Sequence, residues 1–214
     1  MEERRTIAVE GVIGAGKTSL ATFLAKRLGG RLVLEEVEEN PFLPLFYEDR
    51  ERFAFSTQVF FLMSRYRQQQ QLGRLDLFEH TVVSDYLFAK DRIFASVNLN
   101  EQEWVLYERL AGLFVEKTAP PDVVVYLQAN TETLIGRIAR RGREYERDME
   151  VAYIRALGEA YNQFFFHYTA SPLLVVNTSG MDFAHREKDL EEVFEQVRTP
   201  FKGTRYYVPM GGQP

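Results

Sequence analysis

Short apolar segments alternate along the chain with longer segments in which apolar residues recur every three or four positions. The short segments predict strands, and the near-continuous valines of 122–128 are typical of a parallel sheet covered on both faces. The predicted strands are residues 6–10, 31–34, 80–83, 122–128 and 173–176. The predicted helices are residues 19–28, 53–72, 101–117, 131–141, 151–168 and 186–197. This order predicts an α/β fold with a five-stranded parallel sheet and helices on both faces.

Loops separate the predicted elements without any long linker. Asn40, Pro41 and Pro44 predict a loop before the helix at 53–72, and a polar, aromatic segment follows the strand at 80–83. The chain has no internal repeat, so we expect one domain over residues 1–201. The glycine-containing tail at 202–214 is expected to be poorly ordered.

Composition removes several kinds of chemistry. The 214 residues include no cysteine, which excludes disulfides, thiolate nucleophiles, zinc ribbons and iron–sulfur clusters. The 26 Lys and Arg against 31 Asp and Glu give a formal charge of −5, which argues against a nucleic-acid partner. No apolar run approaches the roughly 20 residues that span a bilayer, and residues 1–10 lack the apolar core of a secretory signal. We therefore expect a cytoplasmic protein without a membrane partner.

One glycine-rich segment matches a phosphate-binding loop in full. Residues 11–18 read G-V-I-G-A-G-K-T, which fits G-x-x-x-x-G-K-[ST] between a predicted strand and a predicted helix. The backbone N–H groups of such a loop turn inward onto phosphate oxygens, and the helix N-terminus adds positive charge. Lys17 would reach the β- and γ-phosphates, and Thr18 would offer its hydroxyl to Mg²⁺. The segment therefore predicts a nucleotide site.

Switches, motors and kinases share this loop, so other features must separate them. A guanine-reading N-K-x-D segment is absent because asparagine precedes no lysine in the chain. This disfavours a GTPase switch, and a motor or AAA-type ATPase usually needs a longer chain. A small phosphotransferase is the remaining interpretation.

Three acidic residues follow predicted strands, at the edge where ligands of open α/β sheets bind. We interpret Asp85, after the strand at 80–83, as a carboxylate near Mg²⁺; the alternative is a turn cap. Glu35 and Glu36 follow the strand at 31–34, and because adjacent strand residues point to opposite faces, only one should enter a site. That glutamate would accept the proton of an attacking hydroxyl. The alternative is a solvated acidic loop.

Five arginines fall within residues 137–147, on both sides of Gly142. Gly142 ends the predicted helix, which favours an arginine-rich flap that closes over a transferring phosphoryl group. The alternatives are a solvated helix end and a nucleic-acid patch. Gln58 and Arg65 lie two turns apart on one helix face, where they would either read a base edge or be exposed polar residues.

Together these motifs resemble the deoxyribonucleoside kinase family, the P-loop enzymes that phosphorylate the 5′-hydroxyl of deoxynucleosides. The resemblance runs from residue 7 to about residue 197 and follows the family's order. The matches are residues 11–18, Glu35-Glu36-Val37, Tyr47 eleven residues before Gln58, Gln58 seven before Arg65, Asp91-Arg92-Ile93-Phe94-Ala95, and Arg137, Arg141-Gly142-Arg143 and Glu146. The resemblance implies a P-loop kinase fold, ATP as donor, Mg²⁺ as cofactor, a deoxynucleoside acceptor and a homodimer.

The resemblance also implies a role for each matched residue. Glu35 is similar to the family's general base, while Tyr47 and Glu146 would bond the sugar 3′-hydroxyl. The residues implied in catalysis are Glu35, Lys17, Arg141 and Arg143. Those implied in ATP binding are Gly11, Val12, Ile13, Gly14, Ala15, Gly16, Lys17, Thr18, Ser19, Arg137, Arg141, Arg143, Asp182 and Phe183, the last two in a loop that matches the family's adenine loop. Those implied in substrate binding are Glu35, Tyr47, Gln58, Arg65, Asp85, Asp91, Phe94 and Glu146, and those implied in metal binding are Thr18 and Asp85.

One position departs from the family pattern. Many members carry an acid followed by Arg-Ser after the third strand, whereas this chain has Asp85-Tyr86-Leu87. Another arginine, Arg65 or a flap residue, would then have to approach the transferring phosphate.

This Asp-Tyr variant, with residues 60–66 and the flap 143–146, resembles the bacterial deoxyguanosine kinase and deoxyadenosine kinase branch. Arg65 can donate to O6 and N7 of guanine, which favours deoxyguanosine as acceptor. Deoxyadenosine and deoxycytidine stay open as substrates. Two other readings also stay open: a nucleoside monophosphate kinase of the thymidylate kinase type, and a nucleotide-dependent binding protein that hydrolyses slowly.

Overall fold

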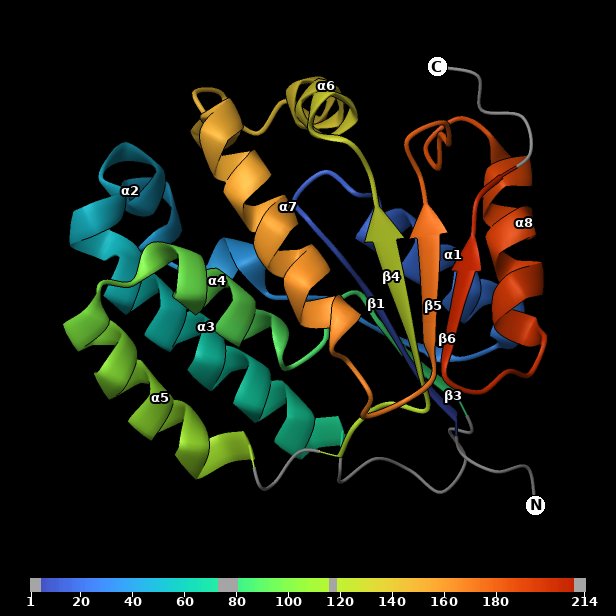
Figure 1. The fold of residues 1–214 in the computed structure, drawn as a ribbon, viewed down its shortest axis with the longest axis horizontal. Helices are drawn as coiled ribbons and strands as arrows, with labels where there is room; N and C mark the ends of the chain where they lie inside the picture. The colour runs from blue at the N-terminus through green and yellow to red at the C-terminus, as the bar shows by residue number, and fades with distance from the viewer. Residues whose placement is uncertain (1–4, 73–80, 116–118, 210–214) are drawn as a thin grey trace.

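A computed structural model describes residues 5–72, 81–115 and 119–209 of the chain. Within them, one sheet has the strand order β2-β3-β1-β4-β5-β6, and every neighbouring pair is parallel (Figure 1). The strands are β1 (Arg5–Gly11), β2 (Arg31–Val33), β3 (Thr81–Ser84), β4 (Val123–Gln128), β5 (Leu173–Asn177) and β6 (Thr204–Tyr207). All carboxyl ends therefore lie at one edge of the sheet.

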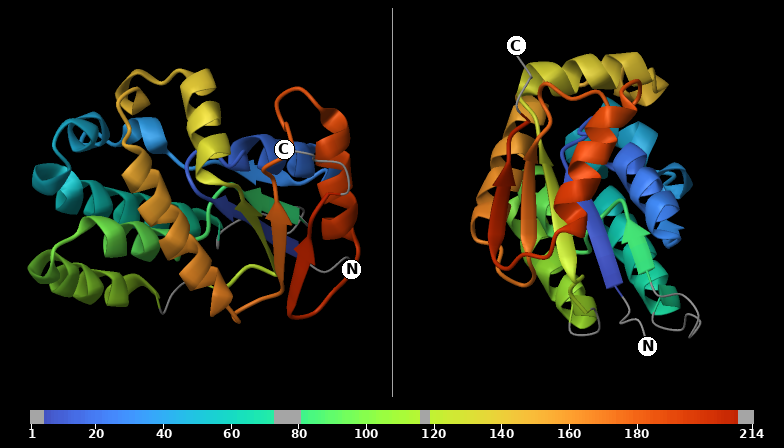
Figure 2. Two further views of the ribbon diagram at one scale, coloured as in Figure 1. Left: turned by 45° about the horizontal axis from the view of Figure 1, so that its top comes forward. Right: turned by 90° about the vertical axis from the view of Figure 1, so that its right-hand side faces the viewer.

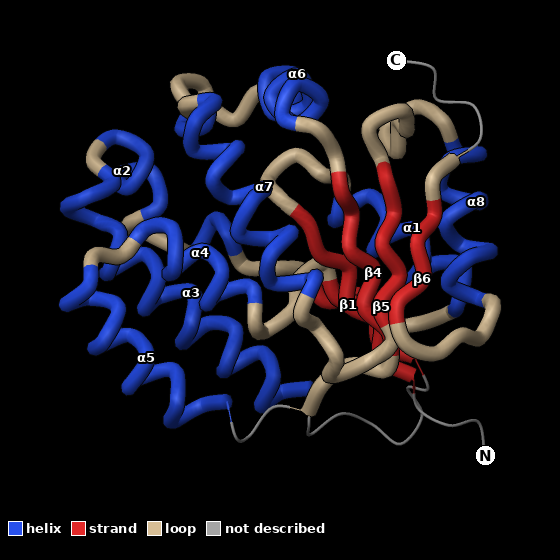
Figure 3. The backbone as a smooth tube through the Cα atoms, in the orientation of Figure 1, coloured by secondary structure: helices blue, strands red, loops and turns tan. Residues whose placement is uncertain are grey.

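Helices surround this sheet on two faces and extend beyond it on one side. Helices α1 and α8 pack on one face, and α7 lies across the other (Figure 2). Helices α2, α3, α4 and α5 form a helical layer beside the sheet (Figure 3). The helices are α1 (Lys17–Leu28), α2 (Leu43–Glu48), α3 (Arg50–Leu72), α4 (Lys90–Asn98), α5 (Glu101–Val115), α6 (Thr131–Arg141), α7 (Val151–Phe166) and α8 (Glu187–Arg198), with short 3₁₀ helices η1 (Val37–Glu39) and η2 (Glu144–Glu146).

The core lies where the valine-rich strand β4 meets α7. Val123–Leu127 are all buried, as the continuous apolar run predicts for a strand covered on both faces. Tyr126 stacks on Tyr161 and Phe165 of α7, with ring centroids 6.1 and 4.2 Å away. Such aromatic pairs fix α7 against the sheet and thereby position the residues at its N-terminal end.

The predicted α/β class, the parallel sheet and the helices on both faces are confirmed, but the sheet has a sixth strand. The expectation of a poorly ordered tail is wrong for residues 204–207, because they pair with β5 along its outer edge. Their sequence, Thr-Arg-Tyr-Tyr, contains no apolar run, and alternate side chains are exposed. An edge strand of this kind is held by backbone pairing, which hydrophobic patterning does not reveal.

Two helices are absent from the prediction. Helix α2 lies where Pro41 and Pro44 indicate a loop, but Pro44 occupies the first turn of the helix, where a missing N–H costs nothing. Helix α4 lies in the polar, aromatic segment after β3 and has too few residues for a clear apolar period. Residue 80 of the predicted strand at 80–83 and residues 116–117 of the predicted helix at 101–117 lie outside the described residues. Over the described ranges, no helix combines the length and apolar character needed to cross a bilayer.

Candidate active site

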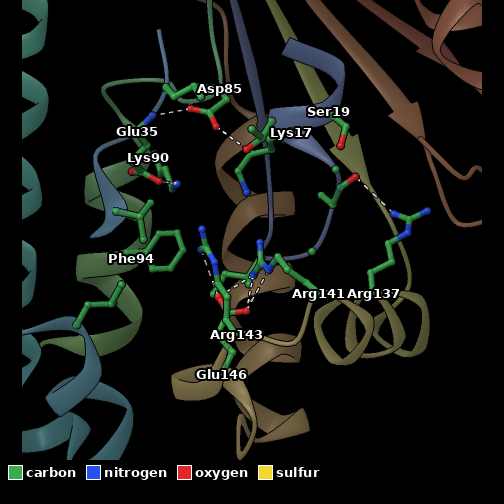
Figure 4. A pocket seen from close by; sticks show the side chains of 18 of the residues that line it. Lys17, Ser19, Glu35, Asp85, Lys90, Phe94, Arg137, Arg141, Arg143 and Glu146 are labelled. Carbon is green, nitrogen blue, oxygen red and sulfur yellow. Dashed lines mark hydrogen bonds and ion pairs between the residues drawn. The ribbon is translucent and has the colours of Figure 1, made fainter. Parts of the chain in front are cut away.

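A cavity of about 610 Å³ opens at the carboxyl ends of β1, β2 and β3 (Figure 4). It lies where the strand order reverses, since β1 sits between β3 and β4, which is the usual ligand position in such sheets. Of the described residues that line it, seven are Lys or Arg and four are Asp or Glu. A cation excess in a chain with a formal charge of −5 indicates an anionic ligand. The predicted site residues in its wall are Ile13, Gly14, Ala15, Gly16, Lys17, Thr18, Ser19, Glu35, Tyr47, Gln58, Arg65, Asp85, Phe94, Arg137, Arg141, Arg143, Glu146, Asp182 and Phe183.

The phosphate loop joins β1 to α1, as predicted. Gly16 caps α1 with a left-handed backbone, φ +97°, and a Cβ there would lie 2.8 Å from the ring of Phe183. Only glycine fits that position without displacing the aromatic ring. The Nζ of Lys17 donates to the carbonyl oxygens of Gly11 and Val12, at 2.9 and 3.2 Å. Burial and the nearby Lys90 lower the pKa of Lys17 to about 8.

Asp85 ties the phosphate loop to the end of β2. The hydroxyl of Thr18 donates to Asp85 Oδ2 at 2.6 Å, and the backbone N–H of Glu35 donates to Asp85 Oδ1 at 2.8 Å. No group of three or more His, Cys, Asp or Glu side chains that could hold a metal occurs in the described part of the chain. The donor set of one hydroxyl and one carboxylate nevertheless suits Mg²⁺, because Mg²⁺ is typically held by one or two carboxylates, waters and substrate phosphates.

Glu35 faces the cavity and is held between two cations. Its Oε1 accepts from Arg65 Nε at 2.9 Å, and its Oε2 accepts from Lys90 Nζ at 2.6 Å. Burial alone would raise the pKa of Glu35, but Lys90 and Arg65 outweigh it and hold the pKa well below its usual range. Glu36 points out of the cavity, where it accepts from the hydroxyl of Ser64 at 2.7 Å. Of the two glutamates, Glu35 lines the cavity and Glu36 does not.

Arg65 is the buried centre of a second set of contacts on α3. Besides Glu35, it pairs with Asp91 of α4, and the hydroxyl of Tyr107 on α5 donates to the other oxygen of Asp91 at 2.8 Å. Asp91 is 1% exposed and is not part of the cavity wall. The carboxylate therefore lies behind Arg65, with both oxygens already bonded, and fixes the direction in which the guanidinium faces.

The far end of the cavity is aromatic, and three residues of the cavity wall, Thr57, Gln58 and Tyr153, carry a buried polar atom without a hydrogen-bond partner among the described residues. Gln58 and Arg65 both line it, as their shared helix face predicts, and Gln58 Oε1 has no hydrogen-bond partner among the described residues. Tyr47 stacks on Tyr145, with ring centroids 5.7 Å apart. Phe94 also lines the cavity and meets Tyr161 edge-on. Flat walls with a few polar atoms suit a planar heterocycle.

The arginine-rich segment forms the third side of the cavity. Helix α6 ends at Gly142, whose φ of +70° confirms the predicted break, and η2 then turns back over the site. Arg141 binds both oxygens of the buried Glu146, at 2.7 and 2.6 Å. Arg143 pairs with Glu38 of η1 at 3.0 Å, so the flap touches the opposite rim.

Arg137 differs from the other two flap arginines. Its guanidinium donates to the carbonyl oxygens of Met181 and Thr178, at 2.7 and 2.5 Å, and to that of Ala15 at 3.4 Å. It thus connects the phosphate loop to the loop that carries Asp182 and Phe183. Figure 4 shows it directed away from Glu146, on the far side of the phosphate loop.

Two buried charged residues at the site, Lys90 and Glu10, were not among the predicted ones. Lys90, 5% exposed, lines the cavity beside Glu35, and Glu10, 0% exposed, lies beneath the phosphate loop. Glu10 accepts from the backbone N–H groups of Gly11 and Leu87 and from the hydroxyl of Tyr161, at 2.9–3.0 Å. Burial raises its pKa. An acid at the end of the buried first strand is the signal that could have identified Glu10.

Tyr86, at the position that departs from the family pattern, does not reach the cavity. Its side chain is 1% exposed and packs against Val33 and Val82, and its hydroxyl has no partner among the described residues. The position is therefore part of the core, and any cation on this side of the site must come from elsewhere.

Comparisons with known proteins agree with this geometry. The family model for deoxynucleoside kinases matches residues 7–201. The chain is 33% identical to the deoxyguanosine kinase of Bacillus subtilis (strain 168), over 90% of this chain and 95% of that one. It is 31% identical to the deoxyadenosine/deoxycytidine kinase of the same organism, over 89% and 90%. The solved structure of deoxyadenosine kinase from M. mycoides with bound dATP superposes with a TM-score of 0.78 at 27% identity, covering 92% of this chain and 100% of that one.

Proposed function

This chain belongs to the deoxynucleoside kinase family, and we propose that it transfers the γ-phosphoryl group of ATP to the 5′-hydroxyl of a purine deoxynucleoside, deoxyguanosine first. The observation that carries the proposal is the continuity of the cavity. One end is the phosphate loop with Lys17, the other is the flat pocket of Tyr47 and Phe94, and Glu35 lies between them. Donor phosphates and an acceptor nucleoside can therefore meet at Glu35.

In the proposed reaction, the 5′-oxygen forms a bond to the γ-phosphorus as the bond to the bridging oxygen of ADP breaks. The hydroxyl proton passes to the carboxylate of Glu35. The charge that spreads over the phosphoryl oxygens is neutralised by Lys17 and by the flap arginines Arg141 and Arg143. Thr18 and Asp85 would hold Mg²⁺, which neutralises charge on the donor phosphates when it is bound.

The base preference rests on Arg65. A guanidinium has only donors to offer, and guanine presents two adjacent acceptors, O6 and N7, where adenine presents N7 beside an amino donor. Asp91 fixes the guanidinium from behind, so we assign Asp91 to orienting Arg65 and Gln58 to contacting the base. Tyr47 and Glu146 are assigned to the sugar 3′-hydroxyl, since both line the nucleoside end of the cavity.

Incubation of the pure protein with ATP, Mg²⁺ and each of the four deoxynucleosides, followed by separation of the products, tests the proposal. We expect a 5′-monophosphate, formed fastest from deoxyguanosine. Faster turnover of deoxyadenosine or deoxycytidine would refute the base assignment and keep the reaction. A diphosphate formed from monophosphate acceptors alone would instead identify a monophosphate kinase, and the absence of product from any acceptor would refute transfer altogether.

The same proposal includes a homodimer in the cytoplasm. The adjacent helices α3 and α5 expose apolar side chains at Met63, Val105, Leu106 and Leu113, which supply a surface for a second copy. The molar mass measured by light scattering as the protein elutes from a size-exclusion column tests for the dimer.

A further inference from the structure

Lys90 occupies a position that local electrostatics disfavour. It is the first residue of α4, where the helix dipole presents partial positive charge, and its side chain is only 6% exposed. A buried ammonium group beside a helix N-terminus is destabilised twice, by loss of water and by the dipole. Residues that break local rules in this way concentrate at functional sites.

Its contacts direct the ammonium group into the cavity. The Nζ of Lys90 donates to Glu35 Oε2 at 2.6 Å and lies 5.5 Å from the centre of the Phe94 ring. Figure 4 shows it beside Glu35 and near Phe94. The charge of Lys90 is also close enough to lower the pKa of Lys17. Two lysines thus approach one space from two elements, with Glu35 beside it.

The other cation that contacts Glu35, Arg65, also binds a second carboxylate. Arg65 is 3% exposed, and its guanidinium binds Glu35 and Asp91 together. Tyr86 lies in the core. Among the described residues next to Glu35, Lys90 is the cation that can turn toward a phosphoryl group without leaving a second carboxylate unpaired.

We propose that Lys90 is a catalytic residue that binds the transferring phosphoryl group from the acceptor side, opposite Lys17. This inference rests on the proposed kinase function and names the cation that the Tyr86 position does not supply. As Lys90 turns to the phosphoryl oxygens, Glu35 Oε2 becomes free for the 5′-hydroxyl. The hydroxyl proton then goes to Oε2, the new bond forms between the 5′-oxygen and phosphorus, and ADP leaves, while Lys90 keeps all its protons.

Kinetics give the first test. Lys90→Met removes the charge and keeps most of the aliphatic part of the side chain, and Lys90→Arg keeps the charge. Lys188→Met is the matched control, because the Lys188 side chain on α8 is 86% exposed. The substrate is the deoxynucleoside that the wild type phosphorylates fastest. We expect Lys90→Met to lower kcat by about 100-fold or more, the typical loss when one donor to a developing oxyanion is removed, and Lys90→Arg to recover at least tenfold of it. A Lys90→Met variant with wild-type kcat would overturn the inference.

An equilibrium measurement separates contact with the phosphoryl group from an effect through Glu35. Calorimetry compares Glu35→Gln with Glu35→Gln/Lys90→Met for binding of the deoxynucleoside and of its 5′-monophosphate, the reaction product. We expect the double variant to bind the monophosphate at least tenfold more weakly, with deoxynucleoside affinity unchanged within threefold. Equal monophosphate affinities would reduce Lys90 to a positioning residue for Glu35.

These variants also keep the inference distinct from the proposed function. The double variant removes both charges of the Lys90–Glu35 pair and leaves Arg65 paired with Asp91, so the fold is less at risk than in Lys90→Met alone. If the wild type makes no monophosphate, the kinase proposal fails. If the wild type is active and neither Lys90 comparison shows its expected loss, only the assignment of Lys90 fails.

Discussion

Glu35→Gln is the substitution for which the structure predicts both a kinetic and a stability effect. Gln keeps the shape of the side chain but cannot accept the proton of the 5′-hydroxyl as a carboxylate does. Loss of a positioned general base typically costs 10²–10⁴-fold, so we expect kcat to fall by about that factor. ATP affinity should change little, because Lys17 and the phosphate loop do not depend on the Glu35 charge for their backbone contacts.

The stability effect follows from the two cations that bind Glu35. The Glu35 side chain is 10% exposed, and its partners Arg65 and Lys90 are 3% and 6% exposed. Removing one partner of a buried ion pair costs about 3–5 kcal/mol. We expect the lower value, about 3 kcal/mol, because the amide oxygen still accepts one of the bonds. For a chain of about 200 residues this lowers Tm by about 6–12 °C.

Glu36→Gln is the matched control. Glu36 is the next residue, its side chain is 31% exposed, and it bonds Ser64 and a surface arginine. An exposed pair of this kind contributes about 0–1 kcal/mol. Glu36→Gln should therefore keep kcat within about threefold and Tm within a few degrees.

Steady-state kinetics and thermal unfolding between pH 3 and 8 check both effects. Because the pKa of Glu35 is lowered in the folded protein, its stabilisation is complete above the usual value of 4.5 and is lost as the pH falls toward the folded pKa. The gap in stability between wild type and Glu35→Gln should be constant from pH 7 to about 5 and narrow below about pH 4. A gap that widens on acidification, or a larger loss of kcat in Glu36→Gln, would refute the assignment.

Three further predictions test other parts of the site. Gly16→Ala places a methyl group 2.8 Å from the Phe183 ring, at a position where φ is +97°. We expect Tm to fall by a few degrees and KM for ATP to rise about tenfold, with a smaller change in kcat. An unchanged KM for ATP would show that the adenine loop is not coupled to the phosphate loop. Tyr107→Phe removes the hydroxyl that donates to Asp91. Differential scanning calorimetry should show that the free energy of unfolding falls by about 1–2 kcal/mol, and KM for the deoxynucleoside should rise while KM for ATP stays constant. Equal changes in both KM values would contradict the role of Asp91 in orienting Arg65. The pKa of Lys17, about 8, predicts that ATP affinity is constant below pH 7 and weakens as the pH rises above 8, because the neutral amine is not attracted to phosphate. Calorimetry from pH 6.5 to 9.5 measures this dependence. The same pH dependence of ATP affinity should be absent in Lys17→Met.

Parts of the site that depend on local sequence could be predicted, and parts that depend on long-range contact could not. The phosphate loop needs glycines and a lysine at fixed spacing, so it follows from the chain itself. The choice of Glu35 over Glu36 rests instead on the family resemblance, because both residues lie after β2, which ends at Val33. Lys90 could not be assigned to the site in that way, because its role depends on the fold placing the start of α4 beside Glu35, which is 55 residues away in the sequence.

The fold shows the same division. The valine run of β4 predicts a buried strand because burial on both faces selects apolar residues at every position. The edge strand β6 forms because α8 ends where the following residues can pair with β5, and the pattern of its side chains does not indicate this backbone pairing. Pro44 illustrates a related case, since proline ends a helix in its interior but begins one in its first turn.

The cation excess of the cavity, set in a protein of net negative charge, has a consequence for how ligands arrive. Field lines from clustered charges concentrate in a concave, low-dielectric opening, so a small polyanion such as a nucleoside triphosphate is steered toward it over about one Debye length, about 8 Å at physiological salt. A large polyanion that cannot enter the cavity instead meets a protein with a formal net charge of −5 and is repelled. The association rate of ATP should therefore fall as ionic strength rises, while its dissociation rate, set by contacts inside the cavity, changes much less.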